Sequence, residues 1–321
     1  MFPETPADRI GRLRTSNYDI SNVCNLRCEG CLYFSGAGDE ILAAEHSIEM
    51  WHSFFAAEAK RGINFAYIAG AEPSLTPDRI RACHEHIPMG VIFTNGTKRI
   101  DSDIDYRIHV SIWGDEVGSK RYRGADINSK AMRNYVDDDR AVFVMTLNSH
   151  NLSEVAAVVT QCADHGLTLT FSLFSPTREY NAPDAARGGA DLRLSADDLA
   201  AARDVMLQAE QLHPDTVRIS HPFINWVTQE GSLYTLDEAQ VATDCGNRLT
   251  RSHVHWNADL QRNSGKCCSP NLDCRDCRPY AMSLATYFNR RRQMPDDWPA
   301  VWQFWSELFL PVRRETPALV P

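Results

Sequence analysis

The sequence predicts an α/β fold in which parallel strands form a partial barrel. Between about residue 17 and about residue 220, short β-rich runs alternate with amphipathic helical stretches, the order expected of βα units around a parallel sheet. The 321 residues can hold one large α/β domain and a small appendage. The β-rich runs predict six strands, at 18–21, 64–69, 90–94, 107–113, 141–147 and 167–173.

Helices are expected between and after these strands. Ser47 opens an amphipathic run to Lys60, Thr76-Pro77 opens a second run, and Gly166 follows a third as a C-cap. The later helical stretches are 128–136, 152–165, 195–212 and 297–309. The last of these carries aromatic residues at helical spacing, so we expect it to cover the base of the barrel.

Composition limits the classes of function. The net charge of −9 makes nucleic acid a poor partner, because phosphate neutralisation dominates that binding. No apolar run has the length needed to cross a bilayer, and the N-terminus lacks the features of a signal peptide, so a cytoplasmic protein is expected. Ten cysteines in such a protein favour metal or redox sites over disulfides.

Three of these cysteines, Cys24, Cys28 and Cys31, stand in a Cys-x3-Cys-x2-Cys spacing directly after the first strand. Three thiolates on a four-iron cluster leave one iron open to another ligand, whereas four thiolates would close the cluster into an electron carrier. A zinc site or a chance cluster of thiols is the alternative. Zinc would require a fourth ligand nearby, and none follows before His46.

Further motifs follow the later strand ends in chain order. They are Gly70-Ala71-Glu72-Pro73, Thr94-Asn95-Gly96-Thr97, Val110-Ser111-Ile112, Tyr122-Arg123-Gly124 and Thr146-Leu147-Asn148. Each motif alone is typical of a turn or a helix cap. Together with the cysteine spacing they resemble the motifs of the radical S-adenosylmethionine (radical SAM) enzymes, and the resemblance covers most of the chain.

The resemblance implies that the open iron binds the amino and carboxylate groups of S-adenosylmethionine (SAM). One electron from the cluster then cleaves SAM to a 5′-deoxyadenosyl radical, which takes hydrogen from the substrate. By the same resemblance, the SAM-binding residues are Gly70, Ala71 and Glu72 for the amino group, Arg123 or Arg133 for the carboxylate, and Asn148 for the ribose. Asn95 and Ser111 are expected as further SAM contacts. Gly30 departs from the family, which often has an aromatic residue there beside the adenine.

A second group of cysteines lies near the C-terminus: Cys245, Cys267, Cys268, Cys274 and Cys277. The segment from Cys245 to Cys267 predicts a β-hairpin, and it is similar to the start of the SPASM and twitch domains that hold auxiliary four-iron clusters. The expected ligands are Cys245, Cys267, Cys274 and Cys277, with Cys267 preferred over Cys268. A structural zinc ribbon is the alternative, because four thiolates bind either group.

These features predict a radical SAM partial barrel at 1–235, a twitch-like domain at 236–285 and a C-terminal helix that packs on the barrel at 286–321. The remaining cysteines that fall in helices, Cys83 and Cys162, are expected to be buried small residues.

The resemblance implies a two-electron dehydrogenation of a small polar substrate, similar to a sugar or an aminocyclitol, with an external donor of the flavodoxin or ferredoxin type. A peptide maturase is the main alternative, although only about twenty residues precede the first strand. A non-catalytic iron–sulfur or zinc protein is the alternative from another class. The catalytic acid or base is unassigned, with Arg178, Glu179, Tyr180 and His221 as candidates.

Overall fold

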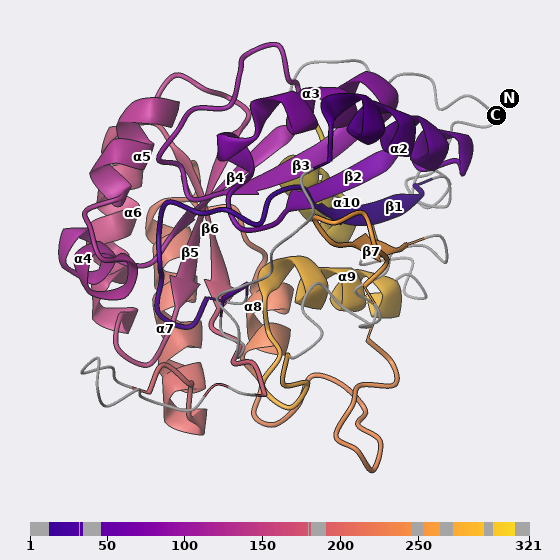
Figure 1. Cartoon of the computed structure of the whole chain (residues 1–321). Helices are drawn as coiled ribbons and strands as arrows, with labels where there is room; N and C mark the ends of the chain where they lie inside the picture. The colour runs from indigo at the N-terminus through magenta and orange to yellow at the C-terminus, as the bar shows by residue number, and fades with distance from the viewer. Residues whose placement is uncertain are drawn as a thin grey trace, which may run out of the picture.

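A single parallel sheet with helices on both faces organises the protein (Figure 1). The computed structural model describes residues 13–31, 33–34, 46–178, 180, 191–245, 253–263, 272–291 and 298–311. The strand order is β6-β5-β4-β3-β2-β1-β7, and each neighbouring pair is parallel. The sheet is therefore open, as a partial barrel requires, and the predicted fold class is confirmed.

The six predicted strands are all present, with ends that move by at most three residues. They are β1 Thr15–Asp19, β2 Phe65–Ala69, β3 Met89–Thr94, β4 Arg107–Ile112, β5 Ala141–Leu147 and β6 Thr168–Leu173. The largest shift is in β1, whose first residues are polar and do not look like a strand in sequence. They are buried because β1 pairs with β2 on one side and β7 on the other.

The seventh strand, β7 His255–Trp256, was expected only as part of a hairpin. The hairpin is present within 253–263, because Asn257 N–H bonds the Gln261 carbonyl at 2.9 Å and Asn263 N–H bonds the His255 carbonyl at 2.8 Å. Its first strand extends the barrel sheet beside β1, with Asn17 opposite His255. The domain limits at 235 and 285 stay predictions.

The helices were predicted where their apolar periodicity is strong. These are α2 Ile48–Lys60, α3 Pro77–His86, α5 Asn128–Tyr135, α6 Val155–Asp164, α7 Ala196–Leu212 and α10 Trp298–Phe309. Three helices were missed, α4 Glu116–Arg123, α8 His221–Val227 and α9 Tyr280–Arg291. The described residues also contain two short 3₁₀ turns, Pro73–Leu75 and Leu152–Glu154.

The six βα repeats are not all complete. Residues 95–106, which connect β3 to β4, contain no helix. The helices that do form begin at the expected caps. Ser195 and Asp198 close a capping box at the start of α7, and Ser47 Oγ accepts a hydrogen bond from Met50 N–H at the start of α2.

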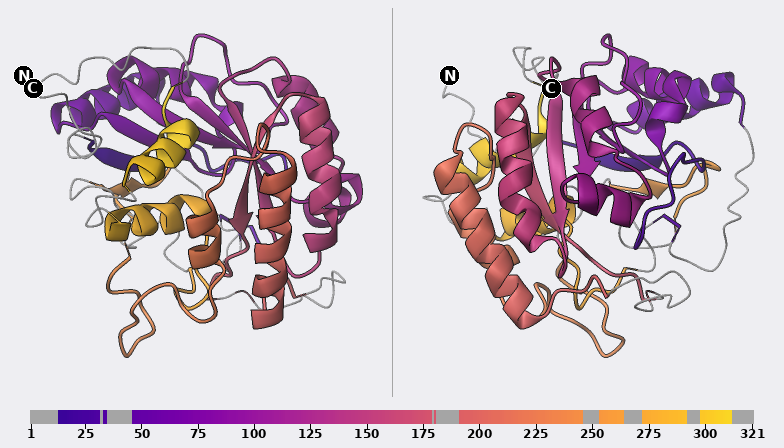
Figure 2. Two further views of the ribbon diagram at one scale, coloured as in Figure 1. Left: turned by 180° about the vertical axis from the view of Figure 1, so that it is seen from behind. Right: turned by 90° about the vertical axis from the view of Figure 1, so that its left-hand side faces the viewer.

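The two faces of the sheet have different coverings. Helices α2 and α3 lie against one face, while α9 and α10 lie against the other, here called the inner face (Figure 2). On the inner face, the Tyr67 and Phe309 rings are 6.0 Å apart and the Phe65 and Trp305 rings 5.9 Å apart. Arg107, the first residue of β4, donates to the Leu310 carbonyl at 2.8 Å. Helix α10 therefore fills the inner face near the amino ends of the strands.

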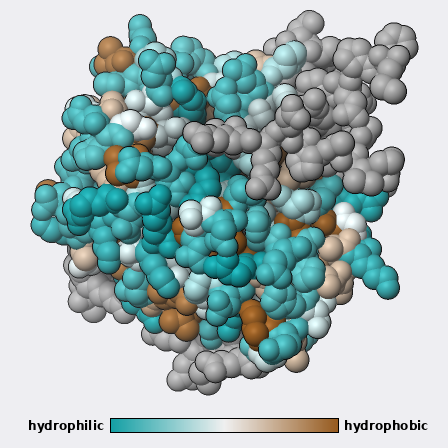
Figure 3. Space-filling view, turned by 90° about the horizontal axis from the view of Figure 1, so that it is seen from above, coloured by the Kyte–Doolittle hydropathy of each residue, from teal (hydrophilic) through white to brown (hydrophobic). Residues whose placement is uncertain are grey.

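The described part of the upper surface is mostly hydrophilic, and its hydrophobic residues form small separate groups (Figure 3). Among the described residues, no helix combines the length and the apolar character that a bilayer-spanning segment needs.

Candidate active site

The predicted motifs meet at one edge of the sheet because every strand of a parallel sheet ends on the same side. The cysteine loop, residues 20–31, follows β1, and Gly70 to Glu72 follow β2. Asn95 follows β3 and Asn148 follows β5. The carboxyl edge of the barrel thus gathers groups that are up to 124 positions apart in sequence, from Cys24 to Asn148.

The cysteine loop holds three free, partly buried thiols, Cys24, Cys28 and Cys31. Burial raises the pKa of Cys24 and of Cys31, and in both cases the nearby thiols raise it further. Hydrogen bonds from the backbone N–H groups of Phe34 and Tyr33 lower the pKa of Cys31. The three sulfurs are thus electrostatic neighbours that gain from a bound cation, which favours the thiolate form.

Binding of a four-iron cluster by the three cysteines stays a prediction. Within the described ranges, no three His, Cys, Asp or Glu side chains converge on the position of one metal ion. The thiolates of a four-iron cluster each bind a different iron, so they need not converge on one point.

Neighbouring strand ends and α4 fix the cysteine loop in place. Ala71 N–H bonds the Ser21 carbonyl at 2.8 Å, and Glu72 N–H bonds the Val23 carbonyl at 3.0 Å. On the side of α4, Glu29 N–H bonds the Tyr122 carbonyl at 2.8 Å. Backbone contacts therefore hold both ends of the loop.

The middle of the loop is tied to the end of β3 by amide side chains. Asn95 Nδ2 donates to Asn25 Oδ1 at 2.9 Å and lies 3.8 Å from Cys24 Sγ. Asn25 Nδ2 in turn donates to Thr97 Oγ1 at 2.9 Å. Asn95 thus sits where it can orient the first cysteine and donate to its sulfur.

Gly70 allows the end of β2 to approach the loop closely. Its φ of +122° is in the range that favours glycine, and a Cβ there would lie 2.7 Å from the Ser21 carbonyl oxygen. A side chain at this position would push the two segments apart.

Glu72 is 1% exposed, and its carboxylate is used within the protein. Oε1 accepts hydrogen bonds from Thr94 Oγ1 at 2.6 Å and Ser74 N–H at 3.0 Å, and Oε2 accepts one from Asn95 N–H at 2.7 Å. Binding of an ammonium group by Glu72 stays a prediction. The structure adds a second role, in which this carboxylate joins the ends of β2 and β3.

Two buried side chains predicted to bind SAM have donors without a protein partner in the described structure. Arg123 donates through one Nη to the Ser111 carbonyl, but its Nε bonds nothing. Asn148 is fully buried and its Nδ2 is likewise unpaired. Buried donors are rarely left unsatisfied, so both fit a polar ligand. Arg123 also lowers the pKa of Cys31, whereas Arg133 is exposed on α5, so the geometry favours Arg123 of the two.

An aromatic group beside the cysteine loop was missed in the sequence. Trp113 and Phe174 each follow a strand end, their rings are 6.0 Å apart, and both pack with Tyr122 and Leu192. A Cβ on Gly30 would lie 2.6 Å from the Phe174 ring. Phe174 thus brings an aromatic ring to the loop at the position where Gly30 lacks one. A single aromatic residue after each of two strands was the only signal in the sequence.

The second cysteine group reaches the same edge of the barrel. Asp273 N–H bonds the Pro176 carbonyl at 3.0 Å and Arg278 N–H bonds Ser175 Oγ at 2.9 Å, which docks the segment of Cys274 and Cys277 on the end of β6.

Two members of this group meet at one tyrosine. Tyr234 OH lies 3.9 Å from Cys277 Sγ, and burial, then Cys277 and Cys245, raise the pKa of Tyr234. Cys245 and Cys277 are therefore close together although 32 positions separate them. Cys267 and Cys268 lie outside the described residues.

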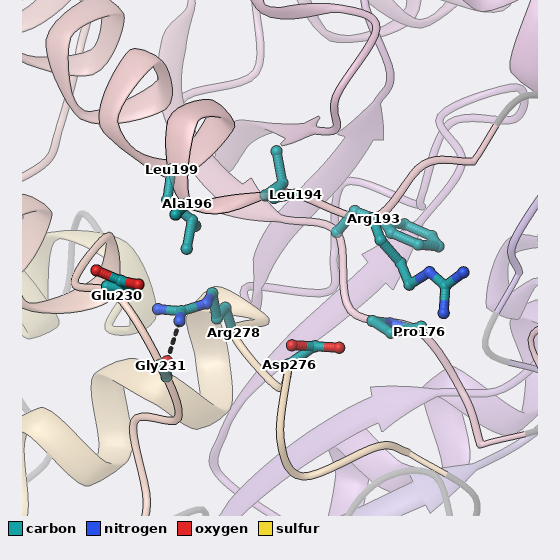
Figure 4. Close-up of a pocket in the computed structure, with 10 residues that line it drawn as sticks. Pro176, Arg193, Leu194, Ala196, Leu199, Glu230, Gly231, Asp276 and Arg278 are labelled. Carbon is teal, nitrogen blue, oxygen red and sulfur yellow. Dashed lines mark hydrogen bonds between the residues drawn. The ribbon is translucent and has the colours of Figure 1, made fainter.

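A pocket of about 230 Å³ lies between the end of β6, the start of α7 and the segment of Cys277 (Figure 4). Its charged lining residues are Arg193, Glu230, Asp276 and Arg278. Arg278 is buried and donates to the Val227 carbonyl at 2.5 Å and to the Gly231 carbonyl. Phe174 lines this pocket and also reaches Gly30, so the pocket adjoins the cysteine loop.

The acid–base candidates from the sequence are only partly placed. Tyr180 packs on Phe174, and its OH accepts a hydrogen bond from Leu192 N–H at 3.2 Å. Arg178 is exposed, and His221 pairs with Glu210 of α7 at 2.6 Å. Glu179 lies outside the described residues.

The fold is that of the radical SAM enzymes, as solved structures with bound SAM show. SuiB of Streptococcus suis, bound to S-adenosylmethionine, matches with a TM-score of 0.54 at 12% identity over 77% of this chain. Native anSMEcpe with bound AdoMet matches with a TM-score of 0.52 at 15% identity over 77% of this chain. SuiB bound to precursor peptide SuiA matches with a TM-score of 0.52 at 11% identity over 77%.

These matches cover 58% of the SuiB chain and 73% of anSMEcpe, so this chain spans less than two thirds of SuiB. No family model matches the sequence, and no curated protein does. At these identities the matches establish the fold, and the predicted radical SAM fold is confirmed.

Proposed function

We propose that the protein is a radical SAM enzyme whose first cluster is bound by Cys24, Cys28 and Cys31. The observation that carries the proposal is that these three free thiols and two buried donors without a partner among the described residues, Arg123 Nε and Asn148 Nδ2, lie at the same carboxyl edge of the barrel. When bound, the cluster and SAM would supply a 5′-deoxyadenosyl radical for hydrogen abstraction.

The protein residues would bind and orient SAM. Arg123 suits the carboxylate because a guanidinium donates several hydrogen bonds to it. The backbone at Gly70 and Ala71 suits the amino group, since the Glu72 carboxylate is already engaged. Asn148 suits the ribose. Phe174 and Trp113 would exclude water from the same region.

We further propose that the second cysteine group holds an auxiliary four-iron cluster and that the substrate is a small polar molecule undergoing a two-electron dehydrogenation. The closeness of Cys245 and Cys277 and the docking of their segment beside the pocket support this. An external redox protein of the flavodoxin or ferredoxin type would supply the electron. Nucleic acid is not proposed as a partner, because the chain is acidic.

A peptide maturase is the second candidate, because SuiB, one of the similar structures, is bound to a precursor peptide. Peptides and small polar molecules offered to the reduced enzyme would separate the two, by which of them raises the rate of 5′-deoxyadenosine formation.

The decisive experiment is anaerobic reconstitution followed by dithionite reduction with SAM. We expect 5′-deoxyadenosine from the wild type and none from a Cys28→Ala variant, with Cys162→Ala as the control because that thiol is fully buried away from the edge. If the wild type binds an iron–sulfur cluster but never cleaves SAM, the proposed enzyme function is wrong and the protein is a non-catalytic iron–sulfur protein.

Iron analysis tests the second cluster separately. The wild type should bind roughly eight irons and a Cys274→Ala, Cys277→Ala variant roughly four, if both sites hold cubanes. Zinc in the wild type that disappears from this variant would instead favour a zinc ribbon.

A further inference from the structure

An ionisable pair on the inner face, Asp19 with His255, has no role in the site described so far. His255 Nε2 lies 2.9 Å from Asp19 Oδ2. The preceding residue, Tyr18, donates to Glu58 of α2 on the opposite face, and side chains alternate along a strand, so Asp19 belongs to the inner face. His255 joins it there because it pairs with Asn17, two residues before Asp19.

The pair lies at the end of the sheet that carries the cysteine loop. Asp19 is the last residue of β1, one residue before the loop begins. Tyr33, just beyond Cys31, has its pKa raised by burial and then by the charges of Asp19, Asp259 and Cys31. Asp19 and Cys31 are therefore both neighbours of Tyr33, and the pair faces the region beneath the loop.

Other contacts besides this pair hold β7 beside β1 and α2. Asn17 N–H bonds the Val254 carbonyl at 2.9 Å, and Trp256 Nε1 donates to Glu58 at 3.0 Å. An uncharged side chain makes a similar hydrogen bond at the start of β1, where Thr15 Oγ1 lies 2.9 Å from His253 Nδ1. Burying a carboxylate is costly, so a carboxylate at Asp19 calls for a role that threonine could not fill.

The carboxylate of Asp19 keeps acceptor capacity and some access. The Asp19 side chain is 12% exposed and that of His255 is 3% exposed, so the accessible side of the pair is the carboxylate. Oδ2 accepts from His255, while among the described residues Oδ1 has only Asn17 Nδ2 at 3.5 Å. A carboxylate has about four acceptor positions, so a donor from a ligand can still bind.

We propose that Asp19, oriented by His255, binds an ammonium group of the substrate and thereby selects a small amino sugar or aminocyclitol. This inference rests on the proposed function and names the substrate class of the same site. A carboxylate held by a histidine and partly screened from water forms a strong charge-assisted hydrogen bond to an ammonium group, and an uncharged amide forms a much weaker one.

The test measures binding of D-glucosamine and N-acetylglucosamine to the anaerobically reconstituted holoenzyme with SAM and no reductant, by titration calorimetry. These probes differ in whether the nitrogen is charged. We expect the wild type to bind glucosamine at least about tenfold more tightly, in line with one charge-assisted hydrogen bond. This preference should disappear in Asp19→Asn and fall in His255→Gln.

His253→Gln is the matched control, since it breaks the neighbouring tie between the same strands. It should keep the preference for glucosamine, and its melting temperature should fall about as much as that of His255→Gln. Equal loss of the preference in both histidine variants would assign the pair a structural role and overturn the proposal. If the wild type itself binds both sugars equally well, the proposal is overturned whatever the variants show.

Dithionite-driven SAM cleavage without sugar, measured on the same preparations, separates this inference from the proposed function. Wild type that cleaves SAM but shows no preference for glucosamine would overturn this inference and leave the radical SAM function in place. Wild type that shows the Asp19-dependent preference but no cleavage would refute the radical SAM function and leave the binding site in place.

Discussion

At the scale of single residues, Glu72 connects more of the candidate site than any cysteine does. Its two carboxylate oxygens accept hydrogen bonds from the turn after β2 and from the end of β3. The backbone N–H of Asn95 donates to Glu72, and the Asn95 side chain donates to Asn25 and lies close to Cys24 of the cysteine loop. The position of the first thiol therefore depends on a buried carboxylate at the end of the neighbouring strand, β2.

Replacing Glu72 by Gln should disturb this connection with almost no change in volume. In one orientation the new amide nitrogen would face the Asn95 N–H. In the other it would face the Thr94 hydroxyl and the Ser74 N–H, so in either case two donors would point at each other. We expect the free energy of unfolding to fall by about 1–3 kcal/mol, the usual effect of an unsatisfied buried group. Urea unfolding measures this change, and cluster occupancy should fall with it.

Glu116→Gln provides the comparison, because Glu116 is an exposed residue of α4 whose one ion pair among the described residues is with Lys120. Its stability should stay within about 0.5 kcal/mol of the wild type. A Glu72→Gln protein as stable as Glu116→Gln would mean that the carboxylate is not needed to join the strand ends.

At the scale of elements, His109 joins β4 to both C-terminal helices. Its Nε2 lies 2.7 Å from the Leu308 carbonyl of α10, so Nε2 carries the proton and donates. Its Nδ1 accepts from the Tyr280 hydroxyl of α9. Burial, the largest cause, lowers the pKa of His109 to about 3, so the ring is neutral in the folded protein.

This neutral histidine should make stability fall in mild acid. Between about pH 6.5 and about pH 3 the unfolded chain protonates this residue and the folded protein does not, so lowering the pH favours unfolding. From pH 7.5 to pH 5 the loss due to His109 is about 2 kcal/mol. Urea unfolding of the wild type and of His109→Gln at both pH values measures it.

The variant will be less stable at pH 7.5, but its stability should depend less on pH by about that amount. His165→Gln, at an exposed position after α6, should retain the steeper dependence of the wild type. Parallel pH profiles for wild type and His109→Gln would refute the assignment of a neutral buried ring.

The sequence predicted those elements and site residues whose signals are local. Cysteine spacing, turn glycines and helix caps are encoded within a few residues, and the structure brings Cys24, Asn95, Arg123 and Asn148 to one edge. Helix α4 was missed because it is short, contains Gly118 and buries polar residues such as Ser119 and Arg123. The pairing of β7 with β1 depends on contacts between residues 238 positions apart, from Asn17 to His255, which no local pattern records.

At the scale of the whole molecule, charge is distributed unevenly around the cysteine loop. The chain carries a net charge of −9, yet exposed cations surround the loop. Arg27 belongs to the loop, Lys98 follows Thr97, which bonds Asn25, and Arg121 precedes Tyr122, which bonds Glu29. Val23, which is 57% exposed, lies in the loop beside the first cysteine. The redox protein proposed above as electron donor is expected to bind at this surface if it is acidic.

Charge reversal at Lys98 and Arg121 should therefore slow reduction by a protein donor without affecting a small reductant. We expect Lys98→Glu, Arg121→Glu to lower SAM cleavage supported by reduced flavodoxin by roughly tenfold at low salt, since such rim charges act mainly on association rates. Cleavage supported by dithionite should stay unchanged.

Lys60→Glu, at the end of α2, is the control for the change in net charge. If it slows the flavodoxin reaction as much as the double variant does, the effect belongs to overall charge rather than to this surface.

The pairing of β7 with β1 also bears on how the protein is made. During synthesis the edge of β1 that pairs with β7 stays unpaired until residue 256 has left the ribosome. By then about four fifths of the polypeptide has been synthesised. Until then the nascent barrel exposes unpaired backbone groups directly beside its first cysteines. A chain truncated by a premature stop codon before β7 would keep that edge permanently, so aggregation, rather than a smaller working barrel, is the expected fate of such fragments.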